Sequence, residues 1–355
     1  MKILYIAESS KNSLSPGSNR ARATIEYLLK ESFDVYDFDV SKIKKRSPGI
    51  GKRHNVLNSF FDSLKGSIRT LDKTIFSSFF YQQIHKLYKL REEHFDIIFV
   101  SYKPPIVIFL GIMGKFLFRA KLVIEYRDLS SLFENKPKFF LIHQVDCLLD
   151  RILLCFADRV IVVSPSQART LKNKFRVNST VIYNGFDNIN PFEQTISINK
   201  KTITYIGTLS ERRNLSKLNY IQKISSFKLQ VLSNENPLLF NPPTDLEIDH
   251  IQPVSRSKMF KTIQQSEFLL LIEGIDSKSH ANIPSKIFEY ISTKNTILFI
   301  GSELSDVYDI LVKYKNFIHL NKYQNLDSFS ITNHDVSKFS RDLQLIKLMG
   351  VLYEL

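Results

Sequence analysis

Two charged residues, Arg127 and Asp128, stand directly after the apolar run at residues 122–126. A carboxylate at the end of a buried strand can accept a proton from a substrate hydroxyl or hold the hydroxyls of a substrate ring, with the neighbouring guanidinium as its charge partner. A structural ion pair is an equally good interpretation of such a dipeptide. Both side chains are therefore candidates for catalysis.

A glycine-containing turn follows the first apolar run of the chain. The segment ESSKNSLSPGSNRARATIEYLL places Pro16, Gly17 and Ser18 just before a helical pattern. Free N–H groups and the dipole at a helix N-terminus favour a phosphate, so Gly17 is a candidate anion-binding position. Many α/β proteins begin in this way, and the signal is weak by itself.

A parallel sheet would bring such segments together. Short β-type runs alternate with helical patterns, which is typical of a parallel sheet covered by helices, and ligands bind beyond the carboxyl ends of its strands. The runs of the first half lie at residues 3–7, 35–40, 96–101, 122–126, 159–163 and 181–183. Those of the second half lie at residues 203–206, 228–232, 246–251, 268–272, 296–300 and 317–320.

The polar stretch NINPFEQTISINKK separates the two sets of runs. We therefore predict two α/β domains at residues 1–187 and 201–335, joined by a linker at 188–200. A C-terminal helix at 336–355 is a candidate for crossing back to the first domain.

Composition excludes several classes of protein. The 355 residues are 43% hydrophobic and 24% charged, which supplies cores for two ordinary domains and excludes a disordered or fibrous chain. Cys147 and Cys155 are predicted to be buried free thiols in a reducing compartment. The apolar start is too short for a signal peptide, and the apolar stretch at 104–118 is shorter than the roughly 20 residues that span a membrane. No transmembrane segment is predicted.

The positive charge is concentrated in the first half. Of the net +14, residues 1–190 hold +12, from 30 Lys and Arg against 18 Asp and Glu. The insertion at about 41–95, which lies in this half, is predicted to form basic amphipathic helices. Helices of this type bind anionic membrane surfaces. An apolar stripe that packs on the first domain, and a merely solvated basic face, are the alternatives. The apolar residues at helical spacing are Phe60, Phe61, Leu64, Ile68 and Leu71, with Lys65, Arg69 and Lys73 between them.

Several segments, in order, resemble one known family. ADRVIVVSPSQARTL followed by VIYNGFD resembles the core of the large retaining glycosyltransferase family four, with Ser164, Asn184, Gly185 and Asp187 at the matching positions. TITYIGTLSERRNLSKL resembles its opening strand, glycine turn and basic helix start. NIPSKIFEYISTKNTILFIG resembles the donor-binding helix of the branch that makes lipid-linked O-antigen and capsule units. The resemblance extends over residues 1–301 and implies the GT-B architecture, two Rossmann-like parallel-sheet domains facing a central cleft.

A nucleotide-sugar donor is what this resemblance implies. The second half of the sequence, which carries the segments that resemble the donor site, has no Asp-x-Asp motif for a metal, so cations and helix termini would meet the charge of the nucleoside diphosphate leaving group. Gly207 lets the backbone approach closely, and Arg212 and Arg213 supply guanidinium groups at the following turn.

The second implied donor segment is a helix opened by Pro284. Ser285 and Lys286 in its first turn suit the diphosphate, and Glu289 would hold the ribose hydroxyls, as the equivalent Glu does in the family. An exposed ion pair between Lys286 and Glu289 is the alternative for these two residues.

One position departs from the wider family. Two glutamates usually stand eight positions apart in this motif, and the residue eight before Glu289 is Ala281. The branch that the chain resembles also tends to lack the first glutamate, so inactivity does not follow. Glu273, His280 and Asn282 are candidate substitutes near the transferred sugar.

The sequence thus predicts a retaining, metal-independent glycosyltransferase that moves a sugar, from a UDP-sugar above all, to a glycan or lipid-linked acceptor of a bacterial surface polysaccharide. Alternatives are a non-catalytic GT-B-like binding subunit, a UDP-sugar epimerase of the same fold, and a nucleic-acid-binding protein, against which the absence of a known motif counts. The predicted catalytic residues are Asp128, Arg127, Arg212 and Lys286, and the predicted donor-binding residues are Gly17, Gly207, Arg213, Ser285, Lys286 and Glu289.

The implied partners follow from this function. They are the nucleotide sugar, the glycan or lipid-linked acceptor and an anionic membrane surface, with no nucleic acid, no metal and no cofactor. The predicted location is the cytoplasm, at the inner face of the membrane.

Overall fold

A computed structural model of the 355-residue chain describes residues 1–8, 16–40, 78–102, 105–127, 150–187, 198–221, 224–320 and 335–355. The chain divides into two compact units. Unit 1 comprises Met1–Ile182 and Leu348–Leu355, and unit 2 comprises Tyr183–Lys347.

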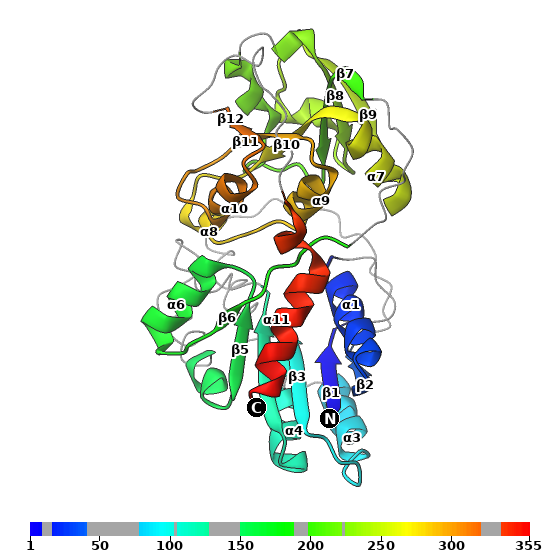
Figure 1. Cartoon of the computed structure of the whole chain (residues 1–355), viewed down its shortest axis with the longest axis vertical. Coiled ribbons are helices and arrows are strands. Elements are labelled where there is room, and N and C mark those ends of the chain that lie inside the picture. The colour runs from blue at the N-terminus through cyan, green and yellow to red at the C-terminus, as the bar shows by residue number, and fades with distance from the viewer. Residues whose placement is uncertain are drawn as a thin grey trace. The chain divides into compact units, whose positions relative to one another are not determined.

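Unit 1 is built on a parallel sheet (Figure 1). Its inner strands are apolar along nearly their whole length because helices cover both faces of such a sheet, whereas the edge strand at Asp34–Asp39 carries three aspartates. In β1, for example, every residue after the first is buried. The strands in spatial order are β2 (Asp34–Asp39), β1 (Lys2–Ala7), β3 (Ile97–Tyr102), β4 (Lys121–Tyr126), β5 (Arg159–Val162) and β6 (Thr180–Val181).

The helices of unit 1 cross from one strand to the next. Ser164 caps one of them, because its side chain accepts a hydrogen bond from the backbone N–H of Gln167, and Pro165 then takes the first helical position. The helices are α1 (Pro16–Lys30), α3 (Ser78–Tyr88), α4 (Pro105–Phe118) and α6 (Pro165–Phe175). None of the described helices is long and apolar enough to cross a membrane.

Unit 2 is built on a second parallel sheet. Alternate residues of its strand β10 enter two different cores: Leu269 and Leu271 pack on one face of the sheet, and Leu270 and Ile272 on the other. The strands in spatial order are β12 (Phe317–His319), β11 (Thr296–Ile300), β10 (Ser266–Ile272), β7 (Asn199–Ile206), β8 (Lys228–Leu232) and β9 (Glu247–Ile251).

Unequal helical layers cover the two faces of this second sheet. Helices at residues 256–265, 286–293 and 306–314 pack on the face of Leu269 together with Phe339, whereas the 3-10 turns at residues 215–220, 224–226 and 237–240 pack on the face of Leu270. The helices are α7 (Arg256–Gln265), α8 (Ser277–His280), α9 (Lys286–Thr293) and α10 (Asp306–Tyr314), and the 3-10 turns are η1 (Leu215–Tyr220), η2 (Ile224–Ser226), η3 (Pro237–Phe240) and η4 (Ser337–Phe339).

The C-terminal helix α11 (Arg341–Tyr353) belongs to both units along its length. At its start, the backbone N–H of Arg341 donates to the carbonyl of Phe186 in unit 2. At its end, Tyr353 packs on Phe33 of unit 1, with ring centroids 5.9 Å apart.

The predicted fold class is confirmed: each half of the chain forms a parallel sheet with helices. All twelve predicted strands occur among the described residues, with ends displaced by a few residues. One prediction was wrong, because Cys155 is an exposed free thiol rather than a buried one. Cys147, Asp128 and residues 41–77 of the insertion lie outside the described residues.

The described end of the insertion is partly core. In α3, Phe80 and Leu87 are buried in the core of unit 1, whereas Tyr81 is 60% exposed. Packing on the core of unit 1 therefore explains why α3 carries an aromatic residue at Phe80. It does not explain the aromatic residue at Tyr81.

A pair of glycines provides a test of the backbone. Gly185 has φ +64°, and a Cβ there would lie 2.8 Å from the backbone of Arg341, whereas a Cβ at Gly350 in α11 would meet nothing within 4 Å. We expect Gly185→Ala to lower the free energy of unfolding by about 2 kcal/mol, because it adds left-handed strain to a backbone clash. The matched change Gly350→Ala should raise it by about 0.5–1 kcal/mol. Urea denaturation measures both, and equal stability of the two variants would contradict this account.

Candidate functional site

The strand order of unit 2 reverses between β7 and β10, which lie side by side although two strands separate them in the chain. Ligands of such sheets bind beyond the carboxyl ends of the strands at this reversal. Gly207 follows β7 and Glu273 follows β10, so both stand at this edge. Gly207 has φ +111°, and among the described residues a Cβ there would come within 4 Å only of Lys286 Cδ, at 3.9 Å. The backbone at Gly207 is therefore uncrowded on that side.

Helix α9 is fixed at the same edge by Tyr290. The hydroxyl of this fully buried residue accepts a hydrogen bond from the backbone N–H of Ile206 at 3.0 Å and donates to the carbonyl of Leu270 at 3.3 Å. These two bonds tie α9 to the ends of β7 and β10. They place Lys286, the first residue of α9, near Gly207.

Lys286 is a buried cation. The residue is only 8% exposed, and its Nζ lies 4.2 Å from the centre of the Tyr205 ring. Within the described part of the chain, no carboxylate lies within ion-pair distance of this Nζ, so the exposed pair with Glu289 is not formed. Burial lowers the pKa of Lys286 to about 7, which the charge of Glu273 opposes and that of Arg213 reinforces.

Glu273 is buried beside Arg213. Its side chain is 3% exposed, and Oε2 lies 3.4 Å from Arg213 Nη2. The second oxygen, Oε1, is buried, and none of the described residues donates a hydrogen bond to it. Lys217 Nζ donates to the main-chain carbonyls of Glu273 at 2.8 Å and Arg212 at 2.9 Å, which ties the two loops together.

The two predicted arginines differ in place. Arg213 acts electrostatically on Lys286, whereas Arg212 is 56% exposed on its side chain and pairs with Asp276 at 3.4 Å. Asp276 in turn caps α8 through the backbone N–H of Ser279. We call Lys286, Glu273 and Arg213 the Lys286 cluster. Of the two predicted arginines, Arg213 thus belongs to this cluster and Arg212 does not.

Glu289 stands on α9, whereas Ser285 precedes this helix instead of lying in its first turn, where the sequence analysis had placed it. The helix begins at Lys286, so Ser285 is its N-cap, and its side chain makes no capping hydrogen bond. Glu289 is largely buried, and burial raises its pKa although Arg256, at 3.9 Å, opposes the rise. Arg256 also pairs with Asp187 at 2.6 Å.

Ala281, which stands eight residues before Glu289, is buried at 3% exposed. Of the substitutes considered, Glu273 and His280 each bury a side-chain atom without a hydrogen-bond partner, Oε1 and Nε2 respectively. Asn282 is exposed.

Unit 1 has a charge network that the sequence analysis missed. Arg20 of α1 donates through Nε to Glu125 Oε1 at 2.8 Å, and the Ser101 hydroxyl donates to Glu125 Oε2 at 2.7 Å. Burial alone would raise the pKa of Glu125, but Arg20 and Arg127 hold it below its ordinary value. The missed signal was Glu125 itself, a single charge inside the apolar run LVIEY.

The predicted residues of unit 1 can be placed in part. Arg127 lies 4.0 Å from Glu125 Oε2, and its side chain is 17% exposed. Gly17 lies in the first turn of α1, which begins at Pro16. In the structure the guanidinium group of Arg127 therefore lies beside the carboxylate of Glu125.

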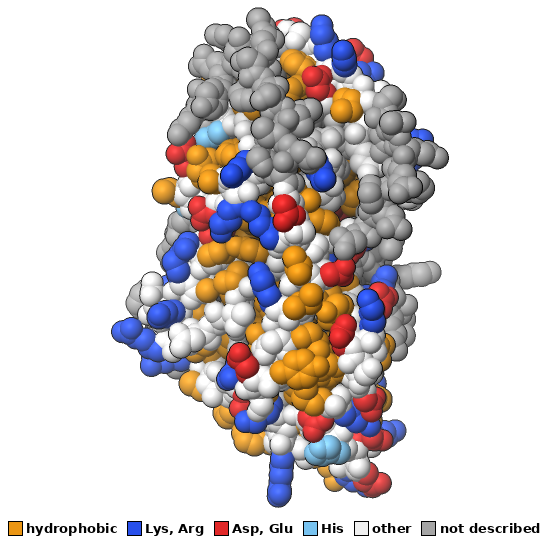
Figure 2. Space-filling view, in the orientation of Figure 1, with side chains coloured by type: hydrophobic (Ala, Val, Ile, Leu, Met, Phe, Trp, Pro, Cys, Tyr) orange, Lys and Arg blue, Asp and Glu red, His pale blue; other side chains and the backbone are white. Residues whose placement is uncertain are grey.

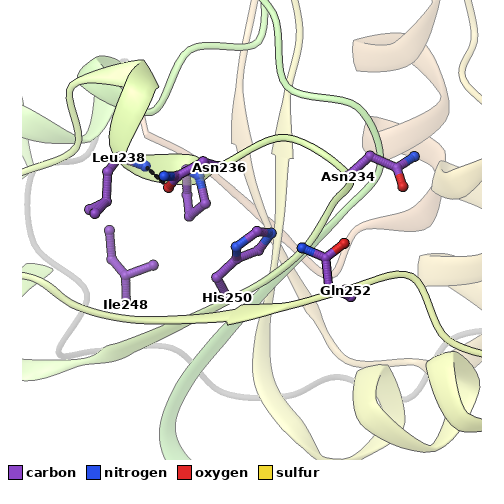
Figure 3. Close-up of a pocket in the computed structure, with 7 residues that line it drawn as sticks. Asn234, Asn236, Leu238, Ile248, His250 and Gln252 are labelled. Carbon is purple, nitrogen blue, oxygen red and sulfur yellow. Dashed lines mark hydrogen bonds between the residues drawn. The ribbon is translucent and has the colours of Figure 1, made fainter. Parts of the chain in front are cut away.

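A separate hollow of about 500 Å³ lies beside the ends of β8 and β9. Figure 3 shows three side chains of the β9 segment, Ile248, His250 and Gln252, which project toward the segment that carries Asn234 and Asn236. His250 Nε2 is already bonded to the carbonyl of Ser233 at 3.0 Å. The lining residues are Asn234, Asn236, Pro237, Leu238, Ile248, His250 and Gln252. Because the described residues of this lining include no Lys or Arg, the hollow is a poorer phosphate site than the surroundings of Lys286.

The placement of Lys286 beside Glu273 and Arg213 predicts how its pKa responds to changes in these two neighbours. We expect Lys286 to titrate near pH 7 in carbon-13 NMR of labelled lysine side chains. Glu273→Gln should lower the pKa of Lys286 further, because it removes a stabilising negative charge, and Arg213→Gln should raise it by removing a positive one. Shifts of opposite sign, or a Lys286 that titrates like an exposed lysine, would contradict the buried placement.

The comparisons with known proteins point to one family and one fold. Residues 66–188, about a third of the chain, match the model of Glycosyltransferase Family 4. Among solved structures, Anabaena Alr3699/HepE in complex with UDP-glucose is similar over 100% of both chains, at 12% identity and a TM-score of 0.53. An alpha-glucosyltransferase in complex with UDP and DNA is similar over 99% of this chain and 90% of its own, at 11% identity and a TM-score of 0.52.

A search of curated protein sequences finds no match. Within the described residues, no group of three or more His, Cys, Asp or Glu side chains is arranged to hold a metal. The chain therefore contains a segment that matches Glycosyltransferase Family 4, within a GT-B-like fold of two parallel-sheet units.

Proposed function

We propose that the chain is a glycosyltransferase that takes its sugar from a UDP-sugar, with retention of configuration and without a metal. The observation that carries the proposal is Lys286, a buried cation without a carboxylate partner among the described residues, beside the uncrowded backbone of Gly207. A diphosphate supplies the missing negative charge. The segment that matches Glycosyltransferase Family 4 supports this choice among anionic ligands, as does the fold shared with HepE.

In this proposal unit 2 holds the donor. Lys286 and Arg213 stabilise the diphosphate, whose charge grows as the sugar leaves, while the departing phosphate helps to deprotonate the acceptor hydroxyl. Ser285 and Gly207 offer donors at the strand ends, and Glu289 accepts hydrogen bonds from the ribose. Arg212 has a lesser role, because it is paired with Asp276 at the surface.

Unit 1 takes the acceptor in this proposal, a glycan or a lipid-linked glycan of a bacterial surface polysaccharide. Arg127 is held by Glu125 near the carboxyl ends of β3 and β4, and Asp128 follows it in the chain. We assign acceptor contacts to these two residues and to the N-terminal turn at Gly17.

Lys286 provides the central test. We expect Lys286→Met to raise the dissociation constant of UDP about 10- to 100-fold, because it removes charge-assisted hydrogen bonds while keeping an apolar stem. Affinity for UDP-glucose, whose diphosphate does not titrate in this range, should fall as pH rises through about 7, because Lys286 loses its proton. Calorimetry in EDTA measures both effects.

The exposed Lys261 of α7 offers the matched control, since Lys261→Met changes the net charge equally. It should leave UDP affinity and its pH dependence unchanged. If Lys286→Met binds UDP as wild type does, or if EDTA abolishes binding and magnesium restores it, the proposed donor site is wrong.

We also infer that unit 1 contacts an anionic membrane surface. The basic insertion motivates this, and α3 and α4, which pack together, expose Tyr81, Tyr88, Met113 and Phe116. Aromatic rings enter the interfacial layer, and each Lys or Arg near anionic headgroups contributes about 1 kcal/mol. On the face in Figure 2, the described Lys and Arg side chains are mixed with Asp and Glu. The argument therefore relies on the insertion and these two helices.

Vesicle co-sedimentation tests the membrane contact. Binding should rise with the anionic lipid fraction, fall with salt, and weaken in Phe116→Ser and in the triple change of Lys65, Arg69 and Lys73 to Gln. Leu239→Ser removes an equally exposed apolar side chain from unit 2 and should have no effect. Protein that stays in the supernatant with strongly anionic vesicles at low salt would exclude this contact.

A further inference from the structure

The hollow beside β8 and β9 has a polar lining without charged side chains. Its volume of about 500 Å³ lies in the range of small-molecule sites, roughly 300–1,000 Å³. The described residues of the lining include no Lys, Arg, Asp or Glu, so neither a phosphate nor a metal cation is matched in charge. They also include no Phe, Tyr or Trp, the side chains on which a nucleobase stacks. A neutral ligand without a flat ring fits this lining best.

Hydrogen-bonding groups line the hollow from two segments. Among the described residues, none is hydrogen-bonded to the side-chain amides of Asn234 or Gln252. His250 Nε2 lies 3.0 Å from the carbonyl of Ser233, and because a carbonyl only accepts, this nitrogen carries the proton. Nδ1 of the neutral ring is then an acceptor. Two amides and a ring acceptor match the hydroxyl groups of a sugar, each of which both donates and accepts.

Apolar side chains complete the lining. Pro237 and Ile248 provide aliphatic surface, and Leu238, which also lines the hollow, is 66% exposed. A single exposed leucine is ordinary on a protein surface. Beside a set of amide groups, however, it gives the carbon–hydrogen face of a sugar ring an apolar surface to bury. The hollow thus combines a few polar groups with apolar surface, as small-molecule sites do.

The hollow lies on the other face of the second sheet from α9. In β9, Ile248 packs in the core on the side of the 3-10 turns, and His250 and Gln252 project to the same side (Figure 3). Ile251 points the other way, into the core that α9 helps to form. The hollow is therefore separate from the helix that carries Lys286.

We propose that the hollow beside β8 and β9 binds a neutral sugar residue of a glycan. Asn234 and Gln252 exchange hydrogen bonds with its hydroxyls, and Leu238 and Ile248 cover its apolar face. The inference goes beyond the proposed function, because the ligand is a sugar without a nucleotide and the site lies apart from Lys286. Only its use rests on that function: a second attachment point keeps the glycan on the enzyme between transfers, because rebinding becomes intramolecular.

Side-chain amide signals locate the ligand. Proton–nitrogen NMR of the full chain records the NH₂ groups of Asn234 and Gln252, which are assigned by their loss in Asn234→Leu and Gln252→Met. At least one of the neutral trisaccharides maltotriose, cellotriose and triacetylchitotriose should shift both signals, with a dissociation constant of about 1 mM. UDP should leave both signals in place and the dissociation constant of the trisaccharide unchanged.

The same substitutions test the contacts. We expect Asn234→Leu and Gln252→Met each to raise the dissociation constant of that trisaccharide about 3- to 10-fold, because each removes hydrogen bonds to a hydroxyl. Both residues are exposed, so the variants keep the fold. The control Gln82→Met makes the same change at an exposed position of α3 and should leave the affinity unchanged.

Three results would overturn the inference. They are the absence of shifts in the two signals with every trisaccharide at millimolar concentration, shifts of both signals by UDP, which would make the hollow part of the nucleotide site, and wild-type affinity in both variants. Failure of wild type to bind UDP would instead overturn the proposed donor site and leave this test of the hollow intact.

Discussion

The chemistry of unit 2 depends on one energetic constraint, the burial of an ammonium group without a carboxylate partner among the described residues. Moving an unpaired charge out of water costs several kcal/mol, and a protein usually avoids that cost by pairing the charge or losing the proton. Lys286 does part of each: its Nζ lies over the Tyr205 ring, and its pKa falls to about 7. An anion beside Lys286 would return the stabilisation that burial removes, which is why the proposed donor site is centred on this residue.

The fold supplies the rigidity that this placement requires. An ammonium keeps its position only if its helix cannot rotate, and the buried Tyr290 hydroxyl bonds α9 to both strands at the reversal of strand order. Lys217 does the same for the loops that carry Arg213 and Glu273. The groups of the proposed donor site thus stand on elements that hydrogen bonds hold in place, which would lower the entropy lost when a ligand binds.

The periodic features of this chain could be predicted from sequence, and the pairing of side chains could not. Buried parallel strands appear in the sequence as apolar runs such as TILFI. Pro284 and the helical pattern of apolar residues after it predict a helix in the region of α9. By contrast, Arg20 and Glu125 are separated by more than a hundred residues, and only the sheet order brings them into contact. The difference between Arg212 and Arg213 is equally invisible, because adjacent residues of one turn point to different neighbours. Exposure of Cys155 was mispredicted because an apolar sequence context does not fix which way a helix faces.

The two units treat a buried carboxylate in opposite ways. In unit 1 both oxygens of Glu125 are bonded, by Arg20 and Ser101, which lowers its pKa and makes it a support for the guanidinium groups around it. In unit 2 the Arg213 contact of Glu273 involves only Oε2, and Oε1 is left unsatisfied. A satisfied network rigidifies a core, whereas a half-satisfied one is a liability unless a ligand completes it. Glu125 is therefore a structural carboxylate of unit 1, whereas Glu273 is a carboxylate of unit 2 whose Oε1 has no hydrogen-bond partner among the described residues.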